Sequence, residues 1–86
     1  MKLNILYFAS LRENLGADRE TLEVDDAAVS TTGDLMKLLS QRGQQWRTVM
    51  LDNPNLLLAV NQETASPDAT LSDGDEVAFF PPVTGG

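Results

Sequence analysis

The sequence predicts a single α+β domain in which one main helix and a short helix accompany a mixed β-sheet. Three observations lead to this prediction. The chain has 86 residues, the length of one small domain. Strand-like patterns occur in both halves of the chain, and a helical apolar repeat lies between them. One main helix can cover only one face of a sheet, so the other face is expected to lack such a cover.

The first part of the chain is predicted to form a strand, a short helix and a second strand. Residues 2–8 contain aromatic and aliphatic side chains in partial alternation, which is typical of a strand. Ser10 and Glu13 have the spacing of a capping box, so we expect Ser10 to be the N-cap of a short helix that Gly16 ends. Residues 20–24 alternate polar and apolar types, which predicts a strand antiparallel to the first.

The main helix is predicted in the middle of the chain. Leucines between residues 35 and 39 have the i, i+3, i+4 spacing of an amphipathic helix. Thr31 or Thr32 is expected to cap its start, and residues 42–43 (Arg-Gly) are expected to end it. Apolar residues at helical spacing within residues 46–50 indicate one more helical turn.

The last part of the chain is predicted to contain two further strands. The apolar run of residues 56–60 predicts a buried strand, followed by a reversal and an irregular stretch through Pro67. Residues 76–80 form the last predicted strand, which must end at Pro81-Pro82 because proline has no amide N–H to donate. This order is that of a β-grasp (ubiquitin-like) domain. That fold class, rather than periodicity, places the first and last strands side by side and parallel at the centre.

Strand alternation predicts an apolar patch on the face opposite the main helix. If Leu3, Ile5 and Tyr7 face the helix, their neighbours along the strand point to the other side. The same reasoning turns Val77 and Phe79 inward in the last strand. Apolar patches of this kind on small proteins usually mark partner surfaces. We therefore predict a partner-binding patch made of Leu6, Phe8, Ala78 and Phe80.

Composition excludes several kinds of function. Thirteen acidic and six basic residues give a net charge of −7, which disfavours nucleic acids and anionic membranes as partners. The chain has neither cysteine nor histidine, so disulfides, the usual zinc sites, Cys–His nucleophiles and Ser–His–Asp triads are ruled out, and no metal site is expected. Neither a signal peptide nor a spanning segment is evident, so we expect a cytoplasmic protein.

The sequence ends in a segment suited to insertion into a partner. Residues 1–80 are predicted to form the domain, and residues 81–86 a flexible, extended tail. Two prolines favour an extended backbone, and two glycines without Cβ atoms fit a narrow channel. The tail consists of Pro81, Pro82, Val83, Thr84, Gly85 and Gly86. A carboxylate at Gly86 needs activation before a nucleophile can displace its oxygen, and the chain has no phosphate-binding loop for that purpose.

These residues resemble the small, sulfur-carrying subunit of molybdopterin synthase. The resemblance runs the length of the chain and is strongest in residues 6–13 and 71–86, with residues 59–62 also fitting. It implies that a ubiquitin-activating-like adenylyltransferase adenylates Gly86 with ATP and that a sulfur donor protein converts it to a thiocarboxylate. The tail then enters the large subunit of a heterotetramer and gives sulfur to cyclic pyranopterin monophosphate. No permanently bound cofactor is implied.

The resemblance also assigns roles to individual residues. Gly86 is implied to be the acyl group and Gly85 its slim neighbour, while Phe8 and Phe80 match docking aromatics and Arg12 a basic position near them. The chain departs from the family pattern in two places. Residues 63–65 (Glu-Thr-Ala) replace apolar residues that often extend the docking patch, and residues 30–32 (Ser-Thr-Thr) are polar where an apolar residue is common.

Three other functions remain open from the sequence. A sulfur carrier for thiazole synthesis or tRNA thiolation has the same fold and Gly-Gly ending, although the Phe-Phe-Pro-Pro-Val ending favours the molybdopterin family. A protein modifier uses the same adenylate and forms an isopeptide bond with lysine. An interaction module with an inert tail would keep its function after loss of Gly85 and Gly86.

Overall fold

The computed structural model describes residues 1–81 and confirms the predicted β-grasp architecture. One sheet has the strand order β2-β1-β5-β3-β4. The remaining tail residues, 82–86, lie outside the described part of the chain. The elements in chain order are β1 (Lys2–Tyr7), α1 (Ser10–Leu15), β2 (Arg19–Glu23), α2 (Thr32–Ser40), α3 (Gln44–Met50), β3 (Leu57–Val60), β4 (Glu63–Ala65) and β5 (Glu76–Phe80).

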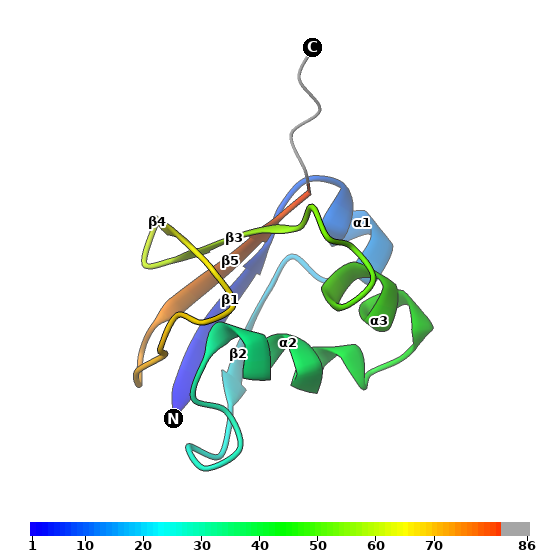
Figure 1. Ribbon diagram of the computed structural model, residues 1–86. Coiled ribbons are helices and arrows are strands. Elements are labelled where there is room, and N and C mark those ends of the chain that lie inside the picture. The colour runs from blue at the N-terminus through cyan, green and yellow to red at the C-terminus, as the bar shows by residue number, and fades with distance from the viewer. Residues whose placement is uncertain (82–86) are drawn as a thin grey trace.

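The two central strands come from opposite ends of the chain. β1 pairs in parallel with β5, as predicted, with Leu6 opposite Ala78. β2 and β3 flank this pair in antiparallel fashion. Figure 1 shows that α1, α2 and α3 all lie on the same side of the sheet. The described residues therefore leave the other face of the sheet without a covering layer.

The core lies between the sheet and the helices. Leu3, Ile5 and Val77 are fully buried, and Tyr7 is 2% exposed. These side chains pack with apolar residues of the helices in one contiguous cluster. The predicted inward set of β1 and β5 is thus confirmed. Because alternate strand residues point in opposite directions, the outward set is determined at the same time.

The start of α1 differs from the prediction. Ser10 is the first residue of the helix, and Ala9 takes the N-cap position with φ 54° and no side-chain cap. The chain must turn sharply from β1 into α1, and Ala9 makes that turn in a backbone region that L-residues rarely adopt. The capping box of Ser10 and Glu13 is therefore absent. Gly16 ends the helix in the left-handed conformation, as expected.

The main helix and the turn after it also refine the prediction. α2 ends at Ser40, before the Arg42-Gly43 pair that was expected to end it. The extra helical turn is a separate helix, α3, which begins after Gly43. Arg42 lies beyond the end of α2, and its guanidinium donates two hydrogen bonds of 2.7 Å to Glu20 on β2.

A fifth strand was missed by sequence analysis. β4 pairs antiparallel with β3, Val60 standing opposite Glu63. Asn61 and Gln62 form the two-residue turn and both have positive φ angles, 52° and 70°. Such a turn usually contains glycine, and β4 is only three residues long, so neither signal for a hairpin was present. The stretch predicted to be irregular therefore begins with an ordered edge strand.

Replacing Thr31 by alanine is expected to lower the free energy of unfolding by about 1 kcal/mol. The Thr31 hydroxyl accepts a hydrogen bond from the Asp34 amide at 3.2 Å, and the Asp34 carboxylate accepts one from the Thr31 amide at 3.2 Å. Urea unfolding would measure the change. The matched control is Thr48→Ala in α3, where the threonine caps nothing and alanine favours the helix. Equal loss in both variants would contradict a capping role.

A polar network fastens β2 to the turn between α2 and α3. The Tyr7 hydroxyl donates to Glu20 at 2.8 Å, and Arg42 forms its bidentate ion pair with the same carboxylate. The Arg42 guanidinium also lies 4.7 Å from the centre of the Trp46 ring. Hydrogen bonds from Arg42, and then from Tyr7, hold the pKa of Glu20 below its ordinary value.

This network predicts a pH dependence of stability. Because the pKa of Glu20 is lowered by folding, its contribution is present above the ordinary glutamate pKa of about 4.3 and is lost as the pH falls through the lower folded-state pKa. The urea midpoint is therefore expected to decrease on acidification. Glu20→Gln should lower the urea midpoint at neutral pH and should make its decrease on acidification smaller. An acid transition of unchanged size in that variant would assign the dependence to other carboxylates, such as Asp34.

Candidate protein-docking site

The apolar part of the open face is built from residues of three strands whose side chains point away from the helices. Leu6 of β1 stands opposite Ala78 of β5, and Leu57 of β3 stands opposite Phe80. Ala59 stands opposite Ala78 on its other side. The register thus brings the residues predicted on β1 and β5 onto one surface and adds two from β3.

Two aromatic rings dominate this surface. The Phe8 and Phe80 rings stack with their centroids 4.7 Å apart and their planes 6° from parallel. The Phe8 amide donates to the carbonyl oxygen of Phe79 at 3.1 Å, which extends the β1–β5 pairing by one residue and aligns the two rings. Phe8 is 41% exposed although it is a large apolar residue. The pair therefore presents an apolar surface that nothing within residues 1–81 covers.

Ala78 contributes less accessible surface than predicted. It is only 5% exposed, whereas the sequence placed it in an uncovered patch. Its direction is as predicted, but its short side chain lies in a central strand between two neighbouring strands. Larger side chains beside it shield its methyl group from water. Ala78 therefore lies at the floor of the patch and contributes little accessible surface to it.

Leu57 and Ala59 are the functional candidates that sequence analysis missed. Leu57 is 42% exposed and lies directly across from Phe80. Both residues belong to an apolar run that the sequence predicts to be buried, which holds for Ala59 at 8% exposure and is wrong for Leu57. Applying strand alternation to a strand antiparallel to β5 would have placed them on the open face. The patch is thus wider than predicted, and we call Leu6, Phe8, Leu57, Ala59, Ala78 and Phe80 the docking patch.

The far edge of this face is polar. Thr64 of β4 stands opposite Ala59 and is exposed. This is the segment in which the sequence departs from the family pattern. β4 therefore borders the docking patch on the side away from β2, and the patch is not continued there by a large apolar side chain.

Arg12 lies within the described part of the chain, whereas most of the tail does not. Arg12 is exposed on α1, which begins two residues after Phe8, while Leu11 and Leu15 anchor that helix in the core. Its part in docking stays a prediction. Pro81 is half-buried and follows Phe80 directly, so the described part of the chain ends beside the stacked pair of Phe8 and Phe80. The predicted tail residues Pro82, Val83, Thr84, Gly85 and Gly86 lie outside the described residues.

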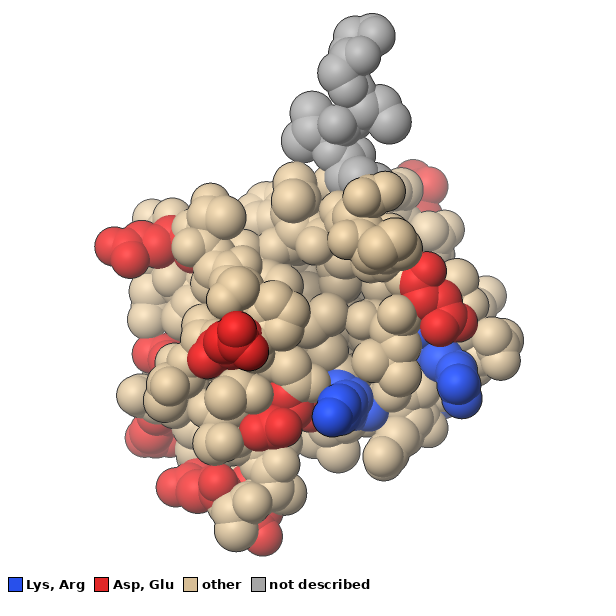
Figure 2. Space-filling view, in the orientation of Figure 1, with Lys and Arg blue, Asp and Glu red and all other residues tan. Residues whose placement is uncertain are grey.

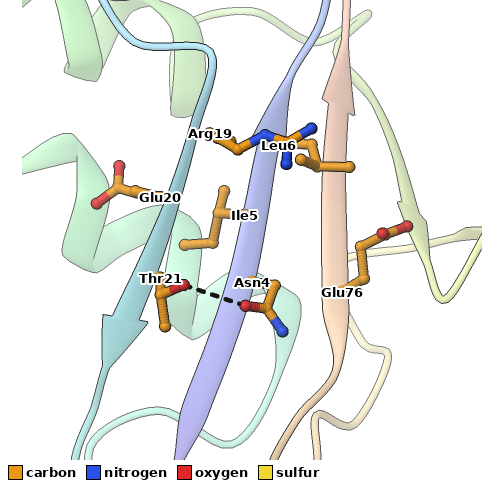
Figure 3. Close-up of a pocket in the computed structure, with 7 residues that line it drawn as sticks. All are labelled: Asn4, Ile5, Leu6, Arg19, Glu20, Thr21 and Glu76. Carbon is orange, nitrogen blue, oxygen red and sulfur yellow. Dashed lines mark hydrogen bonds between the residues drawn. The ribbon is translucent and has the colours of Figure 1, made fainter.

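A shallow hollow of about 480 Å³ continues the open face toward β2. The Thr21 hydroxyl donates to the Asn4 side-chain oxygen at 3.2 Å across its floor. Figure 3 shows Arg19 extending from β2 across β1 to lie beside Leu6, with Glu76 on the opposite side. The open face therefore has an apolar part beside the tail and a polar part farther from it.

Two kinds of feature are absent from the described residues, and their charged side chains are unevenly distributed. Within residues 1–81 no three His, Cys, Asp or Glu side chains come together in a way that could hold a metal ion. None of the helices in this part of the chain is long and apolar enough to cross a membrane. Figure 2 shows acidic side chains scattered over the face in view, where basic ones gather at the lower right.

Comparison with known proteins identifies the family. The model of the ThiS family matches residues 5–86, nearly the whole chain. The chain belongs to the ThiS family. It is 43% identical over 84 residues to the molybdopterin synthase sulfur carrier subunit of Haemophilus influenzae, covering 98% of this chain and 99% of that protein.

Solved structures show the same fold. Small archaeal modifier protein SAMP1 from Haloferax volcanii superposes with a TM-score of 0.79 at 28% identity, and all of both chains is covered. The same fold occurs in a complex of subunits 1 and 2 of the molybdopterin-converting factor from Helicobacter pylori, with a TM-score of 0.68, 20% identity and full coverage of both chains. The β-grasp prediction is thereby confirmed.

Proposed function

We propose that this member of the ThiS family is the sulfur carrier subunit of a molybdopterin synthase. The observation that carries the proposal is the position of the stacked Phe8–Phe80 pair, at the point where β5 passes into the tail. A partner that binds the exposed rings is thereby placed to receive the segment that ends in Gly85-Gly86. The end-to-end similarity to a sulfur carrier subunit supports the same function.

The proposed chemistry takes place at the carboxylate of Gly86. A ubiquitin-activating-like adenylyltransferase joins this carboxylate to AMP and releases pyrophosphate from ATP. Sulfide from a sulfur donor protein then attacks the acyl carbon and AMP leaves, which gives the thiocarboxylate directly. A donor persulfide instead forms an acyl disulfide with loss of AMP, and a thiol of the donor then cleaves this disulfide, so that the thiocarboxylate is released and a protein disulfide forms. The resulting thiocarboxylate supplies sulfur to cyclic pyranopterin monophosphate, and the carboxylate is restored by water. The chain thus acts as a protein co-substrate that is recharged after each transfer.

The large subunit of the synthase is the proposed docking partner. This chain has no histidine and no cysteine, the side chains that most often serve as general base or nucleophile. We propose that the large subunit supplies the acid–base groups and the pterin site, in a cytoplasmic heterotetramer with a carrier chain at each end. The docking patch, with its exposed aromatic side chain, has the composition of an interface core.

Intact-protein mass spectrometry tests the proposed function. The chain is incubated with ATP, the adenylyltransferase and a sulfur source from the same organism. The expected result is a mass gain equal to the replacement of one oxygen by sulfur. Absence of this gain, while the same enzymes charge a control carrier, would contradict the proposal. Sulfur transfer to a thiazole or tRNA precursor in place of the pterin would keep the carrier chemistry and reassign the pathway.

A protein-modifier function is the second candidate, favoured by the likeness to SAMP1. A modifier forms the same adenylate but transfers its acyl group to a lysine amine, with loss of AMP and a proton. Peptide mass spectrometry of cell extracts would then find Gly86 joined to lysine side chains. A thiocarboxylate without such conjugates supports the carrier function.

A further inference from the structure

We propose that Arg19 anchors the docked partner by an ion pair, so that the partner places a carboxylate at the polar end of the open face. This inference rests on the proposed function, because it takes the large subunit as the docking partner. It names a chemical feature of the partner, an aspartate or glutamate that faces β2. Neither the predicted docking residues nor the similarity to other carriers identified Arg19 as part of the interface.

Arg19 has a place on the same surface as the docking patch. It stands opposite Leu6 in the antiparallel pairing of β1 and β2, and both residues line the hollow at this end of the face. Its side chain is exposed and extends across β1 toward Leu6 (Figure 3). A partner that covers Leu6 would therefore also cover the Arg19 guanidinium.

The Arg19 guanidinium has no ion-pair partner within residues 1–81. No carboxylate of residues 1–81 lies within ion-pair distance of its guanidinium. Arg42 provides the contrast, because it is paired with Glu20 at 2.7 Å on the helix side of the sheet. Glu20 follows Arg19 directly, but strand alternation turns its side chain to the opposite face. The geometry thus leaves Arg19 free for a group from outside.

The neighbours of Arg19 favour a carboxylate as that group. Thr21 donates to the side-chain oxygen of Asn4, which leaves the Asn4 amide N–H groups as donors in the same hollow. Glu76 lies on the opposite side of β1 and repels an anion there, so a partner carboxylate is directed to the β2 side. Leu6 is apolar, and a partner seated on it excludes water, which strengthens the ion pair.

The net charge of the chain makes this cation distinctive. Only six of the 86 residues are basic, and the net charge is −7. Lys2, at the other end of β1, stands opposite Glu23 in the register and so has an acidic neighbour on its own face. On the open face of the sheet, an acidic partner residue would be repelled near Glu23 and Glu76 and attracted at Arg19. Such a contact selects one orientation of the partner as well as adding affinity.

Charge reversal tests the proposal. Binding of the large subunit from the same organism is measured by isothermal titration calorimetry for the wild type, Arg19→Glu and the matched control Lys37→Glu, which reverses an exposed charge on α2. We expect Arg19→Glu to weaken binding at least about tenfold at low salt, with a smaller difference at high salt, and Lys37→Glu to change it by less than about twofold. Equal effects of the two reversals would overturn the proposal.

Chemical cross-linking tests the carboxylate directly. The Arg19→Lys variant places an amine at this position, and a carbodiimide joins an amine to a carboxylate in contact with it. We expect a cross-link from position 19 to an aspartate or glutamate of the large subunit. A complex that forms normally but gives no such cross-link would overturn the proposal. Failure of the wild type to bind would instead count against the large subunit as partner, independently of Arg19.

Discussion

Deletion of Gly86 is expected to abolish sulfur transfer by this chain while leaving its fold and stability unchanged. The proposed reaction uses the carboxylate of Gly86, and the deletion moves the terminal carboxylate back to Gly85. An activating site that holds a reacting carbonyl within a few tenths of an ångström cannot accept such a displacement. The core and the polar network lie within residues 1–81, so urea unfolding should be unaffected.

Two further forms of the chain separate the steps of this reaction. One alanine added after Gly86 keeps every native residue but moves the carboxylate outward, and it should block charging equally. A wild-type chain made chemically with the thiocarboxylate in place should deliver sulfur without ATP. Mass spectrometry follows the charging, and the yield of the pterin dithiolene follows the transfer. Full activity of the deleted chain would show that Gly86 does not carry the sulfur.

Replacement of Phe8 by alanine is expected to weaken binding of the large subunit by about 30-fold or more. Aromatic anchors at the centre of an interface typically contribute 2 kcal/mol or more, and Phe8 offers its ring already aligned by Phe80. The loss of stability should be small, about 1 kcal/mol, because Phe8 is exposed and mainly loses its stacking on Phe80. The variant should therefore fold and still fail to dock.

The control for Phe8→Ala is Leu38→Ala. Leu38 is 38% exposed, close to the 41% of Phe8, but it lies on α2, away from the open face. Calorimetric titration with the large subunit should give near-normal affinity for Leu38→Ala and reduced affinity for Phe8→Ala. If both variants bound as tightly as the wild type, the docking patch would not be the interface. If both lost affinity equally, the effect would come from general loss of apolar surface.

Much of the fold follows from local sequence patterns. Alternation in residues 2–8 and 76–80 placed Leu3, Ile5, Val77 and Phe79 in the core and turned Phe8 and Phe80 outward. The leucine spacing predicted α2, and Thr31 was one of the two residues expected to cap it. These features depend on the chain's own periodicity and on hydrogen bonds between near neighbours. The choice of the β-grasp topology required a resemblance to known proteins, because periodicity carries no information on strand order.

The tertiary structure alone decided the features that depend on distant contacts. β4 is too short to be seen as a strand, and pairing with β3 is what orders it. The N-terminus of α1 is set by the sharp exit from β1 at Ala9 rather than by the capping potential of Ser10.

In the docking site, too, some features follow from local sequence patterns and others from tertiary contacts. The sequence by itself determined the direction of Phe8 and Phe80 and the composition of the tail, since both are local properties of the chain. Only the tertiary structure stacked the two rings, added Leu57 across from Phe80, and placed Arg19 beside Leu6. The physical reason is that lateral pairing and register of strands bring together residues from distant parts of the chain, and no local pattern encodes which strands become neighbours.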